Sequence, residues 1–114
     1  MNGVVLVKAS VQFFDPPTPG GFRILSAVDQ CANKLGDLRI TSGCDGAHSG
    51  PDDPHHTGNA FDVGSHEFST EQKDLILAQI MNYLGWERFY GFLESPGTDQ
   101  EHFHFQVKKG TVYP

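Results

Sequence analysis

The segment from Glu101 to Phe105 reads Glu-His-Phe-His-Phe and constrains the fold more than any other part of the chain. In a β-strand, successive side chains point to opposite faces of the sheet. His102 and His104 would therefore share one face, while Phe103 and Phe105 would point the other way into a core. The pattern predicts a sheet with one apolar face and one polar face that carries two neighbouring imidazoles.

The remaining chain predicts two helices and four further strands. One helix is expected from Phe22 to Leu35, ended by Gly36, and a second begins after Ser69 or Thr70 and ends at Gly85. The first would bury Phe22, Leu25, Val28, Ala32 and Leu35, and the second Leu75, Ala78, Ile80, Met81 and Leu84. Strands are expected at 3–7, 38–41, 59–64, 88–93 and 102–107. This order predicts an α+β fold with an antiparallel-rich sheet and two main helices.

Length and charge limit the function classes. The 114 residues suit a single domain spanning 1–114. Eight basic residues against fourteen acidic ones give a net charge of −6, which argues against a nucleic-acid partner and against docking onto an anionic membrane. No apolar stretch is long enough for a membrane helix, and no signal peptide is seen. We expect a soluble monomer.

The two cysteines, Cys31 and Cys44, could be joined in one disulfide or remain as two free thiols.

All six histidines lie between residues 48 and 104, in the order His48, His55, His56, His66, His102 and His104. His48 and His66 have no partner at ligand spacing and are read as ordinary surface residues. His55 differs, because Asp62 follows on the next predicted strand and the small residues Gly58 and Ala60 lie between them. A histidine at the end of a loop and a carboxylate on the next strand can converge on one ion.

The two segments together indicate a catalytic zinc site. Three protein ligands would leave a fourth position for water, whereas a structural site fills all four, usually with thiolates. Zinc lowers the pKa of a bound water to about 7 and polarises a carbonyl group. A nearby carboxylate can then carry the proton to the leaving amine, and Glu101 is the best-placed candidate in sequence. Calcium is disfavoured, because imidazoles are poor ligands for a hard cation.

The pattern His55-x-x-Gly58-x-Ala60-x-Asp62, followed by Glu101-x-x-His104, resembles the zinc-dependent DD-peptidases of peptidoglycan metabolism. That family includes D-alanyl-D-alanine carboxypeptidases and the L-alanyl-D-glutamate peptidases of phage endolysins, and it shares its fold with the hedgehog signalling domain. The resemblance covers about residues 22–108. It implies a hedgehog/DD-peptidase-like fold, zinc ligands at His55, Asp62 and His104, and an acid/base at Glu101.

The chain departs from this family where an arginine usually follows a Ser-Gly-aromatic stretch. The corresponding stretch reads Ser42-Gly43-Cys44-Asp45, so an aspartate stands in the place of the arginine. Arg39 or Arg23 is a candidate replacement. A serine that commonly precedes the first ligand by two positions is Asp53 in this chain. Asn59, Asp53 and His56 are expected to line the approach to the metal.

Strand parity leaves the acid/base residue open. Glu101 and His104 are three positions apart, so a regular strand would place them on opposite faces. Glu101 keeps the role that the resemblance implies if it lies at the strand entrance, after the loop 97–100. If the strand begins earlier, His102 becomes the better candidate.

The resemblance implies a bacterial or phage metallopeptidase, cytoplasmic or released from the cell or virion, that cleaves peptidoglycan stem peptides or related D-amino-acid peptides. The expected partner is a peptide or muropeptide substrate. The alternative is a hedgehog-like zinc-binding module without peptidase activity, which the missing arginine favours and the retained Glu101 disfavours. The third hypothesis is a globular domain whose histidines have no common function.

Overall fold

The computed structural model describes residues 3–45 and 53–109. Its elements follow one another as β1 (Val5–Val7), α1 (Pro19–Leu35), β2 (Leu38–Ser42), β3 (Ala60–Gly64), α2 (Thr70–Leu84), β4 (Phe89–Glu94) and β5 (His102–Val107). This is the predicted order of helices and strands, and the predicted bounds of β5 are confirmed. No helix in the described ranges is long and apolar enough to cross a membrane.

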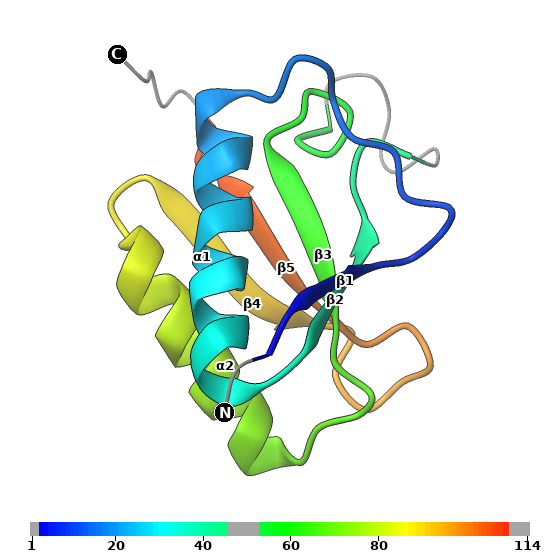
Figure 1. The fold of residues 1–114 in the computed structure, drawn as a ribbon, viewed down its shortest axis with the longest axis vertical. Helices are drawn as coiled ribbons and strands as arrows, with labels where there is room; N and C mark the ends of the chain where they lie inside the picture. Colours follow the sequence, from blue (N-terminus) through cyan, green and yellow to red (C-terminus); the bar gives the residue numbers. More distant parts are fainter. Residues whose placement is uncertain (1–2, 46–52, 110–114) are drawn as a thin grey trace.

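The five strands form one mixed sheet in the order β1-β2-β3-β5-β4. β1 pairs with β2 in parallel, whereas the β2–β3, β3–β5 and β5–β4 pairs are antiparallel. Both helices pack against the same face of this sheet, side by side (Figure 1). The domain is therefore a two-layer α+β structure, and the second face of the sheet carries no helix among the described elements.

The core lies between the sheet and the helices. Phe103, Phe105 and Val107 of β5 point into it together with Phe61 and Val63 of β3. Opposite them, α1 contributes Ile24, Ala27, Val28, Cys31 and Ala32, and α2 contributes Ile76, Ile80, Met81 and Leu84. The alternation predicted from the His-Phe-His-Phe segment is confirmed on the apolar side, because both phenylalanine side chains are fully buried.

The prediction of which side chains the first helix buries was partly wrong. α1 begins at Pro19, after the N-cap Thr18, and it buries Ile24, Ala27 and Cys31, while Phe22 is 61% exposed and Leu35 is 40% exposed. Two apolar stripes overlap in this segment at helical spacing. The buried stripe faces the core, and the predicted burial of Val28 and Ala32 is confirmed.

The second helix begins as predicted. Ser69 is its N-cap, and a capping box joins Ser69 and Gln72 through two hydrogen bonds, of 2.8 and 3.2 Å. Burial of Ile80, Met81 and Leu84 is confirmed. Leu75 and Ala78 are exposed, and Ile76 is buried instead. The reason is that α2 packs on both α1 and β4, which selects the side of the helix that carries Ile76 and Ile80.

Cross-strand register builds the polar face. Asp62 of β3, His104 of β5 and Phe92 of β4 lie directly opposite one another across the three strands. The neighbouring row contains Gly64, His102 and Glu94. These two rows, together with the loop before β3, position the candidate site.

The two cysteines, which the sequence left unassigned, are free thiols, with Cys31 buried in the core.

Candidate metal centre

Three side-chain atoms meet on the polar face of the sheet. Nδ1 of His104 lies 3.0 Å from Oδ1 of Asp62, Nε2 of His55 lies 3.2 Å from the same oxygen, and the two ring nitrogens are 3.3 Å apart. All three residues are buried. The structure therefore brings together the three ligands that the resemblance implied, from a loop and two adjacent strands.

This triangle fits zinc in both size and chemistry. Zinc binds imidazole nitrogen and carboxylate oxygen at about 2.0–2.2 Å, so the ligand atoms of a tetrahedral site lie roughly 3.3 Å apart. The observed separations of 3.0–3.3 Å are close to that edge length. Two imidazoles and one carboxylate are ligands that zinc accepts readily.

A tight turn before β3 presents His55. The Asp53 carboxylate accepts a hydrogen bond from the His55 amide at 2.9 Å, and the amide of Gly58 donates to the His55 carbonyl at 3.1 Å. Gly58 has φ +79°, and a Cβ atom there would meet the Phe14 side chain at 2.6 Å. Only glycine suits this position. Asp53, expected near the approach to the metal, thus helps to form the turn that carries a ligand.

The carbonyl of Gly43 orients the His55 ring. It lies 2.9 Å from Nδ1, which must therefore carry the proton, so the lone pair of the neutral ring is on Nε2. Asp45 holds Gly43 in place, because its Oδ1 accepts from the amides of Gly43 at 2.7 Å and Gln12 at 3.1 Å. The aspartate that stands where the family has arginine therefore supports the loop behind a ligand.

Gln106 orients the second ring in the same way. Its Oε1 lies 2.8 Å from Nε2 of His104, so that nitrogen donates and Nδ1 is left to face Asp62. His104 and Gln106 are two positions apart on β5 and share its polar face. Hydrogen bonds of this kind to the outer nitrogen are typical of metal-binding histidines.

The surroundings of Asp62 and His104 shift the pKa values of both side chains. Burial alone would raise the pKa of Asp62, but hydrogen bonds from His104 and His55 and the charges of His55 and His102 outweigh it and hold that pKa well below its usual range. Burial alone would lower the pKa of His104, but bonds to Asp62 and Gln106 and the charges of Asp62 and Glu94 raise it above its usual value. The neighbouring histidines thus keep the Asp62 carboxylate ionised.

Glu94 and His102 flank the centre on the β4 side. Nε2 of His102 lies 3.0 Å from Oε1 of Glu94 and 3.4 Å from Oδ2 of Asp62, and Oε1 of Glu94 is 3.8 Å from Nδ1 of His104. One atom from each of Asp62, Glu94, His102 and His104 can be chosen so that all four lie within 4.8 Å of one another. The structure thus contains an Asp/Glu/His/His cluster that could hold a metal ion.

Glu94 was not among the predicted site residues. Tyr90 and Phe92 are exposed on the face of β4 that points away from the helices. Because side chains alternate along a strand, residue 94 lies on that face as well. The register that sets Glu94 opposite His102 is a tertiary property, and the sequence contains no direct signal of it.

The structure does not bring Glu101 to the metal centre. Its Oε1 accepts from Ser65 at 2.7 Å and pairs with Nζ of Lys73 on α2 at 2.6 Å, and its Oε2 accepts from the Gly97 amide at 2.9 Å. Lys73 belongs to the helical layer, on the opposite side of the sheet from His102 and His104. These contacts do not support the predicted proton-transfer role of Glu101, although β5 begins at His102 and so leaves Glu101 at the strand entrance, as that role required. Of the two acid/base candidates, His102 is the one that faces the centre.

The predicted substrate residues are spread around the site. The side chain of Asn59 accepts a hydrogen bond from Thr18 at 2.8 Å and donates to Thr57 at 3.3 Å, so it joins the loop before β3 to the N-terminus of α1. Arg39 is exposed on β2, and His56 is half-buried in the turn beside His55. His48 lies outside the described residues.

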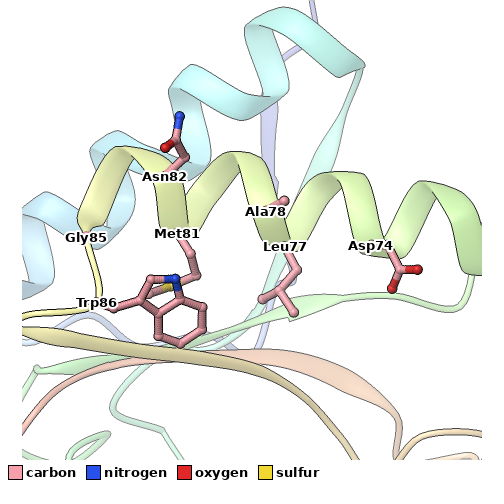
Figure 2. Close-up of a pocket in the computed structure, with 7 residues that line it drawn as sticks. All are labelled: Asp74, Leu77, Ala78, Met81, Asn82, Gly85 and Trp86. Carbon is pink, nitrogen blue, oxygen red and sulfur yellow. The ribbon is translucent and has the colours of Figure 1, made fainter.

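A separate groove of about 430 Å³ runs along α2 and its C-terminal end (Figure 2). It is lined by Asp74, Leu77, Ala78, Met81, Asn82, Gly85 and Trp86. Figure 2 shows the Leu77, Met81 and Trp86 side chains on the same side of the helix. None of the metal-centre residues lines this groove, so it is a distinct feature of the surface.

Comparison with known proteins gave no match: no protein-family model, no curated protein and no solved structure matches this chain.

Proposed function

We propose that the chain is a zinc-dependent peptidase whose ion is held by Nε2 of His55, Oδ1 of Asp62 and Nδ1 of His104. One observation carries the proposal. The three atoms lie 3.0–3.3 Å apart, and the outer nitrogen of each ring is engaged by an oxygen, from Gly43 in one case and Gln106 in the other. In the neutral rings, two inward-facing lone pairs beside the Asp62 carboxylate would bind a cation in place of the protons that they carry when no ion is bound.

The surroundings of the centre support a hydrolytic use. Zinc in such a site supplies a Lewis acid and an activated water. The Glu94 side chain is 46% exposed, so a substrate can approach along the β4 side. Phe92 is 44% exposed and its ring centroid lies 5.1 Å from that of His104, which offers an apolar surface next to the reacting position. His102 and Glu94 can hold polar groups of a substrate there.

The substrate class rests on the motif resemblance. Peptidoglycan stem peptides and related D-amino-acid peptides are the substrates that it implies, and the amide bond is the bond that a zinc site of this kind hydrolyses. Arg39 and His56 remain the predicted substrate-binding residues, and Arg39 offers a cation for a substrate carboxylate from the exposed side of β2.

A second candidate is a zinc-binding module without peptidase activity. The position of Glu101 favours it, because the carboxylate that the resemblance assigned to catalysis is bound by Lys73, Ser65 and Gly97. In this case the ion would only stabilise the fold or an interaction surface.

Digestion of purified muropeptides, read by mass spectrometry, separates the two candidates. The zinc-loaded protein should cleave one amide bond, and a chelator or His104→Ala should abolish the cleavage. His66→Ala is the matched control, because His66 is exposed and its ring bonds to the Asp99 carbonyl, at 3.1 Å. A zinc-loaded protein that leaves every stem peptide intact would contradict the peptidase and support the zinc-binding module.

A further inference from the structure

The two carboxylate oxygens of Asp62 face different groups. Oδ1 faces the inner nitrogens of His55 and His104, at 3.2 and 3.0 Å. Oδ2 faces Nε2 of His102, at 3.4 Å. A carboxylate in this position can bind one ion with each oxygen, which is how carboxylates bridge the paired ions of many two-metal hydrolases, whose ions lie about 3.5–4 Å apart.

His102 repeats the arrangement of the other two histidines. Its Nδ1 lies 2.6 Å from the Gln100 carbonyl, which can only accept, so Nδ1 carries the proton. Its Nε2 then points at two carboxylate oxygens, Oε1 of Glu94 at 3.0 Å and Oδ2 of Asp62 at 3.4 Å. In the neutral ring, a nitrogen lone pair and two anionic oxygens converge on one point.

The two distances from Nε2 of His102 are similar to those in the first set. They are 3.0 and 3.4 Å, on either side of the roughly 3.3 Å expected between ligands of a tetrahedral zinc ion. Glu94 reaches the set from the end of β4, where its side chain is half-exposed. The row Gly64–His102–Glu94 places no side chain of β3 in the way, because Gly64 has none.

We propose that the centre binds a second divalent cation, held by Oδ2 of Asp62, Nε2 of His102 and Oε1 of Glu94, with Asp62 bridging the two ions. This inference rests on the proposed function for its first ion. It assigns His102 and Glu94 a metal-binding role in place of the direct substrate contacts described for them above and of the proton transfer predicted for His102.

The two positions should differ in affinity. The first offers two nitrogens and one oxygen in a buried setting, whereas the second offers one nitrogen and two oxygens at the solvent edge. Imidazole favours zinc, and carboxylates tolerate Mn²⁺ as well. The first ion also neutralises part of the negative charge that attracts the second. The second ion should therefore bind more weakly and exchange more readily.

Metal stoichiometry tests the second site without reference to activity. Calorimetric titration of the metal-free protein with Zn²⁺ should show about two equivalents per chain, in a tight and a weaker step. Glu94→Gln should remove the weaker step and keep the tight one, and the exposed Glu87→Gln is the matched control. Circular dichroism should show that Glu94→Gln remains folded. A weaker step that survives in both Glu94→Gln and His102→Gln would overturn the proposal.

Electron paramagnetic resonance of the Mn²⁺-loaded protein tests the bridge itself. At about two equivalents, the wild type should give the spectrum of a spin-coupled pair, and Glu94→Gln should give an isolated ion. A wild-type spectrum with only isolated ions at that loading would overturn the bridging role of Asp62.

The outcomes separate this inference from the function it rests on. Muropeptide cleavage by a protein that binds only one zinc would overturn the second site and leave the peptidase standing. Two bound ions without any cleavage would support the second site and contradict the peptidase.

Discussion

Glu101 lies three positions before His104, so the two side chains point to opposite faces of the sheet. Odd positions of β5 face the helices, and Glu101 continues that alternation just before the strand. Its side chain therefore meets Lys73 of α2 instead of the metal centre. The hydrogen bond from the Gly97 amide, with those from Lys73 and Ser65, lowers the pKa of Glu101 to about 2.

The lowered pKa of Glu101 predicts how stability depends on pH. A carboxyl group whose pKa is lower in the folded state stabilises the fold above its usual pKa, here 4.5, and this contribution is lost as the pH falls towards 2. Urea unfolding should show the wild type more stable than Glu101→Gln at pH 7, with the difference shrinking between pH 4.5 and 2. Glu87→Gln should follow the wild type throughout.

A constant difference between wild type and Glu101→Gln across that range would contradict this assignment. The same variant separates the two roles of the residue. Glu101→Gln should keep its zinc affinity, because Glu101 binds Lys73 and Ser65 and not the centre.

At the scale of elements, β5 combines core and site. Its even positions, His102, His104 and Gln106, face the metal centre, and its odd positions face the helices. This strand was predictable because alternation with period two is a local property. The helix faces were harder to predict. α1 carries two apolar stripes, and only its packing on the sheet selects the one with Ala27 and Cys31 over the one with Phe22 and Leu35.

Gln106→Ala tests how much β5 contributes to orienting its own ligand. Loss of the 2.8 Å hydrogen bond to Nε2 of His104 leaves the ring free to rotate. Zinc affinity should fall by about 10- to 100-fold while the fold is retained. Competition with a chromophoric chelator measures the affinity, and the exposed Gln30→Ala on α1 is the control. An unchanged affinity in Gln106→Ala would contradict the orienting role.

At the scale of the whole molecule, the centre joins three parts of the chain. His55 belongs to a loop, Asp62 to β3 and His104 to β5. These three ligands come together only in the folded state. The binding free energy of an ion that they hold would therefore add to the stability of the domain.

Zinc should therefore stabilise the folded protein. At a free zinc concentration one hundred times the Kd, the free energy of unfolding should rise by about 2.7 kcal/mol. Differential scanning calorimetry with zinc and with chelator should show a higher Tm for the zinc-loaded wild type. His66→Ala should show the same rise, and His55→Ala should lose most of it. An equal Tm in zinc and in chelator for the wild type would argue against a metal at the centre.

The sequence by itself determined the order of elements, the alternation of β5 and the chemical character of the site. These follow from local rules: period-two patterning, helix capping at Ser69, and the affinity of histidine and aspartate for divalent metals. Beyond the three residues that the resemblance implied, tertiary structure alone decided which side chains meet. Strand register set Glu94 opposite His102, and packing of α2 brought Lys73 to Glu101. Such contacts join residues distant in sequence, and no local pattern records them.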